Sequence, residues 1–161
     1  MKETPDQLKN QTPEQLRNDE NAFKRILVGV DDSADAQLAF KYAINAAREA
    51  DADLIITSIL ENSEMNIYQA LSRDYVHGER EDLEKHIEEY RDFAIKAGVK
   101  NVEMVVSEGD PGETIVKNVI PATKADLLVI GSLAKKGIRK HFGSQAAYMA
   151  KYAPISVMVI R

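Results

Sequence analysis

The sequence contains no cysteine and no tryptophan among its 161 residues, and only 6% of them are aromatic. The absence of cysteine excludes disulfide bonds, thiolate zinc sites, iron–sulfur clusters and cysteine nucleophiles. The scarcity of aromatic side chains leaves little from which to build a stacking surface for single-stranded nucleic acid. No apolar run is long enough for a membrane-spanning helix, and no basic segment followed by an apolar one marks a secretory signal. We therefore expect a cytoplasmic protein without a membrane partner.

The charge balance is acidic, with 21 Lys and Arg residues against 26 Asp and Glu residues and a formal net charge of -5. A protein that coats a phosphate backbone or an anionic membrane carries the opposite excess. Nucleic acid is therefore not an expected partner. The chain length suits one domain with a real hydrophobic core.

Residues 1–23 are polar and contain a near repeat, in which residues 4–10 are followed by the similar residues 12–18. Each copy begins Thr-Pro and carries Gln three residues after the Thr, a pattern typical of a capping box at a helix start. Each copy offers only one Leu to bury, so we predict a polar N-terminal extension at residues 1–23 and a folded domain at residues 24–161. The extension is interpreted either as a partner-binding arm or as a solubilising tail.

Short apolar runs alternate with amphipathic segments along residues 24–161. Strands are predicted at 26–30, 54–60, 102–106, 127–130 and 155–160, and helices after Ser33, at 79–97, from Pro111 and at 144–152. Residues 31–33 supply the N-cap chemistry for the first helix, Asp110 is the predicted cap of the third, and Gly78 is interpreted as a break before the second helix. Strands that alternate with helices predict a doubly wound α/β domain, with a five-stranded, mainly parallel sheet and helices on both faces.

In such sheets, ligands bind outside the carboxyl ends of the strands where the winding direction reverses. The segment after the fourth strand, residues 131–144, contains glycines, hydroxyls and clustered basic residues and leads into a helix. Backbone amides at a helix start make this the strongest candidate anion site, with Ser144 as hydroxyl donor or cap. The alternative is that Gly131 and Gly143 are turn residues and Ser144 is only a structural N-cap. The segment matches neither the dinucleotide fingerprint nor the P-loop.

Several motifs together resemble the universal stress protein family, and the resemblance covers residues 24–161. It is carried by residues 26–31 with Ser33, residues 109–111, residues 126–132, Gly143-Ser144 and residues 153–161. The resemblance implies a small cytoplasmic α/β domain in a family where many members bind ATP. It also implies a homodimer formed through the last strand, here the apolar residues 157–160.

ATP-binding members of that family carry the pattern G-x2-G-x9-G-[ST]. By resemblance, Asp31 would contact adenosine, Ile59 would lie beside adenine, and residues 130–131 and 143–144 would form the two ends of a phosphate loop. The full set implied for the nucleotide is Gly29, Val30, Asp31, Ile59, Ile130, Gly131, Ser132, Ala134, Gly143 and Ser144. The chain departs from the pattern in two ways: Ala134 replaces the second glycine, and only eight residues, 135–142, precede Gly143.

Three functions are therefore considered. The first is a stress-response module that binds ATP, with or without Mg²⁺, and acts through conformation and through dimer or partner contacts. The second is a protein-interaction member of the same family without nucleotide affinity, suggested by Ala134 and the shorter loop. The third is a slow ATPase, which ranks last because neither Ser132 nor Ser144 has an identifiable His/Asp partner. We predict no catalytic residue and no metal site, and the protein partner is not identified.

Overall fold

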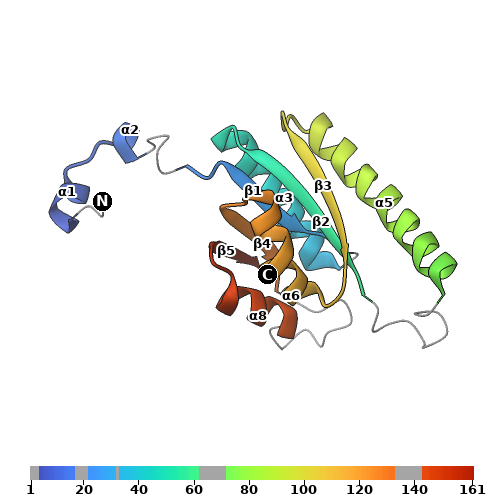
Figure 1. The fold of residues 1–161 in the computed structure, drawn as a ribbon. Coiled ribbons are helices and arrows are strands. Elements are labelled where there is room, and N and C mark those ends of the chain that lie inside the picture. Colours follow the sequence, from blue (N-terminus) through green and yellow to red (C-terminus); the bar gives the residue numbers. More distant parts are fainter. Residues whose placement is uncertain (1–3, 17–21, 32, 62–71, 133–142) are drawn as a thin grey trace.

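The computed structural model describes residues 4–16, 22–31, 33–61, 72–132 and 143–161. Its centre is a five-stranded sheet in the order β3-β2-β1-β4-β5, in which every neighbouring pair runs parallel. The strands are β1 (Arg25–Gly29), β2 (Asp53–Leu60), β3 (Val102–Glu108), β4 (Leu127–Gly131) and β5 (Ser156–Ile160). The chain winds from β1 to β3 and then crosses to β4 on the other side of β1 (Figure 1). This order confirms the predicted doubly wound sheet and places its switch point between β1 and β4.

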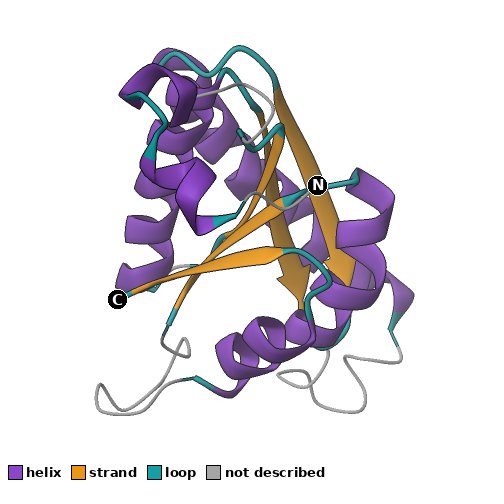
Figure 2. Cartoon of the chain, turned by 90° about the vertical axis from the view of Figure 1, so that its left-hand side faces the viewer, coloured by secondary structure: helices purple, strands orange, loops and turns teal. Residues whose placement is uncertain are grey.

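Helices cover both faces of the sheet, as predicted. One face carries α3 (Ala34–Ala50) and α5 (Arg73–Lys96), and the other carries α6 (Pro111–Thr114), α7 (Ile120–Thr123) and α8 (Ser144–Tyr152). Figure 2 shows the twisted strands crossing the molecule between these helices. Because both faces are covered, the central strands are almost continuously apolar, and β1 and β4 contain fully buried side chains on either side.

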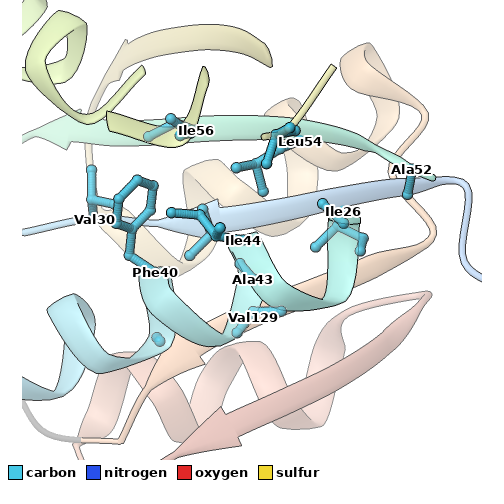
Figure 3. Packing of buried hydrophobic residues seen from close by; sticks show 14 of the residues in the cluster. Ile26, Val30, Phe40, Ala43, Ile44, Ala52, Leu54, Ile56 and Val129 are labelled. Atoms are coloured by element: carbon cyan, nitrogen blue, oxygen red, sulfur yellow. The ribbon is translucent and has the colours of Figure 1, made fainter. Parts of the chain in front are cut away.

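Helix α3 packs closely on the sheet because its buried face is built largely from alanine. Of the three predicted cap candidates, residues 31–33, it is Ser33 that caps the helix, since its Oγ accepts a hydrogen bond from the backbone N of Ala36 at 3.2 Å. Figure 3 shows Phe40, Ala43 and Ile44 of α3 against side chains of β1, β2 and β4. Its buried positions recur at the predicted helical spacing: Ala36, Ala39, Phe40, Ala43, Ile44 and Ala47.

The second helix begins earlier than the sequence predicted. Helix α5 runs through Gly78 and reaches back to Arg73, so the prediction of a break at Gly78 is wrong. A Cβ at Gly78 would meet no atom within 4 Å, so this position lies on an open helix surface. A glycine in such a position costs about 1 kcal/mol relative to alanine, which the packing of the rest of a long helix can offset.

The helical segment after β3 contains a turn that the sequence did not predict. Between α6 and α7, Ile115–Val119 form a π-helical turn, closed by a hydrogen bond from the backbone N of Ile120 to the O of Ile115. Pro121 follows at once, and in a regular α-helix its ring would clash with the carbonyl of Lys117. We attribute the wider turn to this proline. The predicted buried stripe of Ile115, Val116, Val119 and Ile120 is confirmed.

The amino ends of the strands are joined by an ion-pair network around Arg25. Its guanidinium contacts Asp53 at 2.7 Å and Glu103 at 2.9 Å, and its Nε donates to the carbonyl of Thr123 at 2.7 Å. The hydrogen bond to Glu103 contributes most to raising the pKa of Arg25. Asp126 accepts a hydrogen bond from the backbone N of Arg25 at 2.9 Å, which ties the start of β1 to the segment before β4. The amino-terminal end of the sheet is therefore occupied by structural contacts.

Two short helices, α1 (Pro5–Lys9) and α2 (Pro13–Leu16), lie apart from the sheet and its helices (Figure 1). Both begin with the predicted capping box, since Gln7 accepts a hydrogen bond from the backbone N of Thr4 at 2.8 Å and Gln15 accepts one from Thr12 at 2.7 Å. The division of the chain into an extension at residues 1–23 and a domain at residues 24–161 stays a proposal.

Candidate functional site

The candidate site lies at the carboxyl ends of β1 and β4, which are direct neighbours in the sheet. The two strands are aligned with Leu27 beside Leu128 and Val28 beside Val129. One residue further along, a Cβ built on Gly29 would lie 4.0 Å from Cγ2 of Ile130. Residues 101 positions apart in the chain therefore meet at the switch point of the sheet.

Three of the predicted site residues face the same side of the sheet. Ile59 and Ile130 belong to the apolar cluster beneath α6, α7 and α8. Gly29 faces that cluster too, because its missing Cβ would lie 3.8 Å from Cδ1 of Ile115. Apolar side chains therefore surround a glycine here: Gly29 and Ile59 are half-buried, and Ile130 is 3% exposed.

Val30 points the other way. Its side chain is 6% exposed and belongs to the cluster beneath α3 and α5, near Phe40 (Figure 3). Its backbone N donates to the carbonyl of Thr57 at 2.9 Å. Neither the side chain nor the N–H of Val30 is therefore available at the site, which leaves its carbonyl as the group it can offer.

Asp31 begins the turn that leads from β1 into α3. Its Oδ1 accepts a hydrogen bond from the backbone N of Ser33 at 2.7 Å, which fixes the side chain beside the end of the strand. The side chain is half-buried. Within the described residues, the second carboxylate oxygen of Asp31 has no hydrogen-bond partner, so it can accept one from a ligand hydroxyl.

Gly131 ends β4 directly against the first turn of α3. A Cβ at this position would lie 2.8 Å from the backbone N of Ala36 and 2.8 Å from the backbone C of Asp35. Unlike Gly98 and Gly109, Gly131 does not have a positive φ, so its backbone conformation does not require glycine. The interpretation of Gly131 as a turn residue is therefore wrong, because glycine is needed here for close packing of strand on helix.

Ser132 holds the start of the following segment in place. It is 3% exposed, and its Oγ donates to Oδ2 of Asp35 at 2.8 Å. Its backbone N donates to the carbonyl of Ile160 at 2.9 Å, and its carbonyl accepts from the backbone N of Gly143 at 2.8 Å. The two ends of the predicted phosphate loop therefore meet. Ala134 and the rest of residues 133–142 lie outside the described residues.

Helix α8 starts with Gly143 as its N-cap and Ser144 as its first helical residue. The interpretation of Ser144 as the N-cap is therefore wrong. In the part of the chain that the structure describes, no side chain caps the N-terminus of α8. Two other helices that start at the carboxyl ends of the strands are capped, α3 by Ser33 and α6 by Asp110, whose Oδ1 accepts from the backbone N of Glu113 at 3.1 Å.

Two residues near the site had not been predicted to act there. Asp35 anchors Ser132, and Gln145 in the first turn of α8 bonds to the start of α6. Their partners lie 97 and 33 positions away in the chain, so no local sequence pattern marks either contact.

Across the described ranges, no group of three or more His, Asp or Glu side chains is arranged to hold a metal ion. The same ranges contain no helix that is long and apolar enough to cross a membrane.

Comparisons with known proteins point to one family. Residues 22–161 match the sequence profile described as the universal stress protein family. A Staphylococcus aureus protein whose name places it in that family is 29% identical over 140 residues, which are 86% of this chain and 84% of the other.

Solved structures agree with the sequence comparison. The universal stress protein UspA from Lactobacillus plantarum superposes with a TM-score of 0.76 at 26% identity, over 86% of this chain and 97% of that one. A universal stress protein solved in complex with cAMP superposes with a TM-score of 0.63, also at 26% identity, over 88% of this chain and 98% of that one.

Proposed function

The chain belongs to the universal stress protein family, and from that premise we propose that it binds an adenine nucleotide at the carboxyl ends of β1 and β4. The nucleotide would act as a signal that changes conformation and contacts with a partner, in the cytoplasm. The proposal joins a family in which a related protein was solved with cAMP to a site built at the predicted switch point.

The observation that carries the proposal is the open N-terminus of α8. The first amides of a helix have no partner inside the helix and carry a partial positive charge. At this edge of the sheet α3 and α6 satisfy such amides with Ser33 and Asp110, whereas no described side chain does so for α8. The amides of Ser144, Gln145 and Ala146 can therefore receive a phosphate, with the Ser144 hydroxyl as a further donor.

The remaining parts of a nucleoside have matching groups nearby. Gly29, Ile59 and Ile130 offer an apolar surface for adenine. The second carboxylate oxygen of Asp31 can accept a hydrogen bond from a ribose hydroxyl. These three kinds of group, apolar, carboxylate and helix N-terminus, suit the base, the sugar and the phosphate of a nucleotide respectively.

ATP is the proposed ligand, either alone or with Mg²⁺ held mainly by its phosphates. Basic residues at 135, 136, 139 and 140 would add favourable charge for a triphosphate, although they lie outside the described residues. The prediction that Ser132 has no Asp partner is wrong, since its hydroxyl donates to Asp35. A binding role is still favoured over hydrolysis because Ser132 is only 3% exposed and its hydroxyl is held in that contact. Release of phosphate from ATP above that of an Asp31→Ala control would instead support the slow ATPase.

A thermal-shift titration tests the proposal. With ATP at 100 times its dissociation constant, binding should stabilise the protein by about 2.7 kcal/mol and raise Tm by about 5–10 °C. cAMP should be titrated in parallel, because the related complex contains it. A folded protein whose Tm moves with neither ligand would support the alternative function, a protein-interaction member without nucleotide affinity.

A homodimer through β5 is the second part of the proposal. β3 and β5 are the two edges of the sheet. At the β3 edge the Arg80 guanidinium donates to the carbonyl of Val106 at 3.0 Å and pairs with Glu108 at 3.2 Å. At the β5 edge, Met158 in the middle of the strand is 39% exposed. An uncovered apolar edge strand is suited to pair with a second copy.

Val159→Pro should convert the dimer to a monomer. The carbonyl of Ile160 faces β4, so alternation along the strand turns the N–H of Val159 toward the free edge. Proline removes that donor and its ring obstructs the edge, while the bonds to β4 remain. Sedimentation velocity should show a dimer for the wild type and for a Val159→Thr control. A wild-type monomer at micromolar concentration, or a Val159→Pro dimer, would contradict the proposed interface.

A further inference from the structure

Gln145 connects the first turn of α8 to the first turn of α6. Its Oε1 accepts a hydrogen bond from the backbone N of Gly112 at 2.7 Å, and its Nε2 donates to Oδ2 of Asp110 at 2.9 Å. Asp110 uses its other oxygen, Oδ1, to cap α6 through the backbone N of Glu113. One amide side chain thus bonds both a free backbone amide and the cap residue of a neighbouring helix.

The backbones of the two helices also approach closely at this point. A Cβ on Gly112 would lie 2.6 Å from Oε1 of Gln145 and 3.3 Å from its backbone O. Only glycine at position 112 therefore leaves room for the Gln145 side chain. The position of the α8 start is fixed by polar bonds on one side and by the bond between Gly143 and Ser132 on the other.

We propose that Gln145 is a positioning residue for phosphate binding, which holds the open amides of α8 in place before a nucleotide arrives. The inference rests on the proposed nucleotide-binding function. Its direct support is the contrast between the two helix starts: Gln145 satisfies an amide of α6, while the amides of its own helix have no side-chain cap in the described residues.

A fixed helix start binds an anion more tightly than a mobile one, because less conformational freedom is lost on binding. The effect concerns the phosphate alone, since Gln145 touches no residue assigned to the base or the ribose. If Gln145 positions the phosphate site, its replacement should reduce the preference for ATP over adenosine. If its role is purely structural, its replacement should lower the affinities for both ligands alike.

Gln145→Ala tests this prediction in the full-length protein, by calorimetric titration with ATP and, separately, with adenosine. We expect the affinity for ATP to fall about five- to tenfold and that for adenosine to change by less than about twofold. Equal losses for both ligands, or an unchanged affinity for ATP, would overturn the positioning role. If the wild type binds neither ligand, the proposed function itself fails, which this design separates from a failure at Gln145.

An exchange of the amide and the carboxylate between positions 145 and 110 tests the contact independently of any ligand. Gln145→Glu brings two carboxylates together, and Asp110→Asn leaves Gln145 facing a second amide, so each single variant should have a lower Tm than the wild type. In the double variant, Asn at 110 can donate to Glu at 145, and all three hydrogen bonds are restored. The double variant should therefore be more stable than Gln145→Glu, and a Tm no higher than that of Gln145→Glu would overturn the proposed bridge.

Discussion

Gly131→Ala is expected to destabilise the protein by about 1–3 kcal/mol, which corresponds to a fall in Tm of about 2–12 °C. The added methyl group would lie 2.8 Å from two backbone atoms of Asp35 and Ala36, where no side chain can rotate away. Either β4 or the start of α3 must shift, and both lead directly into the candidate site. Denaturant unfolding followed by circular dichroism measures the effect.

Gly29→Ala provides the matched control for stability, because it makes the same change at the same end of the adjacent strand. Its methyl group would lie 3.8 Å from Ile115 and 4.0 Å from Ile130, which is ordinary van der Waals contact. The free energy of unfolding should change by less than about 1 kcal/mol. A similar loss in both variants would show that any side chain at these strand ends is harmful and that close packing on α3 is not the cause.

Asp31→Ala is expected to lower the affinity for ATP by about 10- to 100-fold. The variant removes a charged acceptor, and hydrogen bonds to charged groups contribute about 1.5–3 kcal/mol. Asp31→Asn should have a smaller effect, because Asn retains an oxygen for the backbone N of Ser33 and so keeps the turn. Calorimetric titration of both variants with ATP gives the comparison.

Ser33→Ala is the control for the turn itself. It removes the cap of α3 and should cost about 0.5–2 kcal/mol in stability, but it leaves the Asp31 carboxylate in place. The affinity for ATP should therefore stay close to that of the wild type. An Asp31→Ala variant that binds ATP as well as Ser33→Ala does would contradict a contact between Asp31 and the ribose.

Much of the fold could be predicted from the sequence, because a parallel sheet covered on both faces requires short, continuous apolar strands. Residues 54–60 and 127–130 stand out for this reason, and alternation with amphipathic segments was enough to predict a doubly wound sheet with helices on both faces. The helix caps at residues 31–33 and at Asp110 could also be predicted, because a cap bonds backbone amides only two or three residues away and so leaves a local sequence pattern. The start of α5 could not be predicted, because a single glycine such as Gly78 does not by itself end a helix.

The candidate site could be predicted only in outline. The motif around Gly131 was found, but the physical reason for the glycine was not, because it depends on the approach of α3 to β4. The same holds for Gln145, whose partners Asp110 and Gly112 belong to another helix. Sequence patterns report spacing within one element. These contacts depend instead on how two elements are placed relative to each other.

The central claim, that the open start of α8 receives the phosphates of an adenine nucleotide, is tested most directly by calorimetric titration of the wild-type protein with ATP and with adenosine. The account predicts saturable binding of one ATP per chain and clearly weaker binding of adenosine, since the helix start acts only on the phosphates. Equal affinity for the two ligands would contradict the assignment of α8. No binding of either ligand to folded, nucleotide-free protein would contradict the function as a whole.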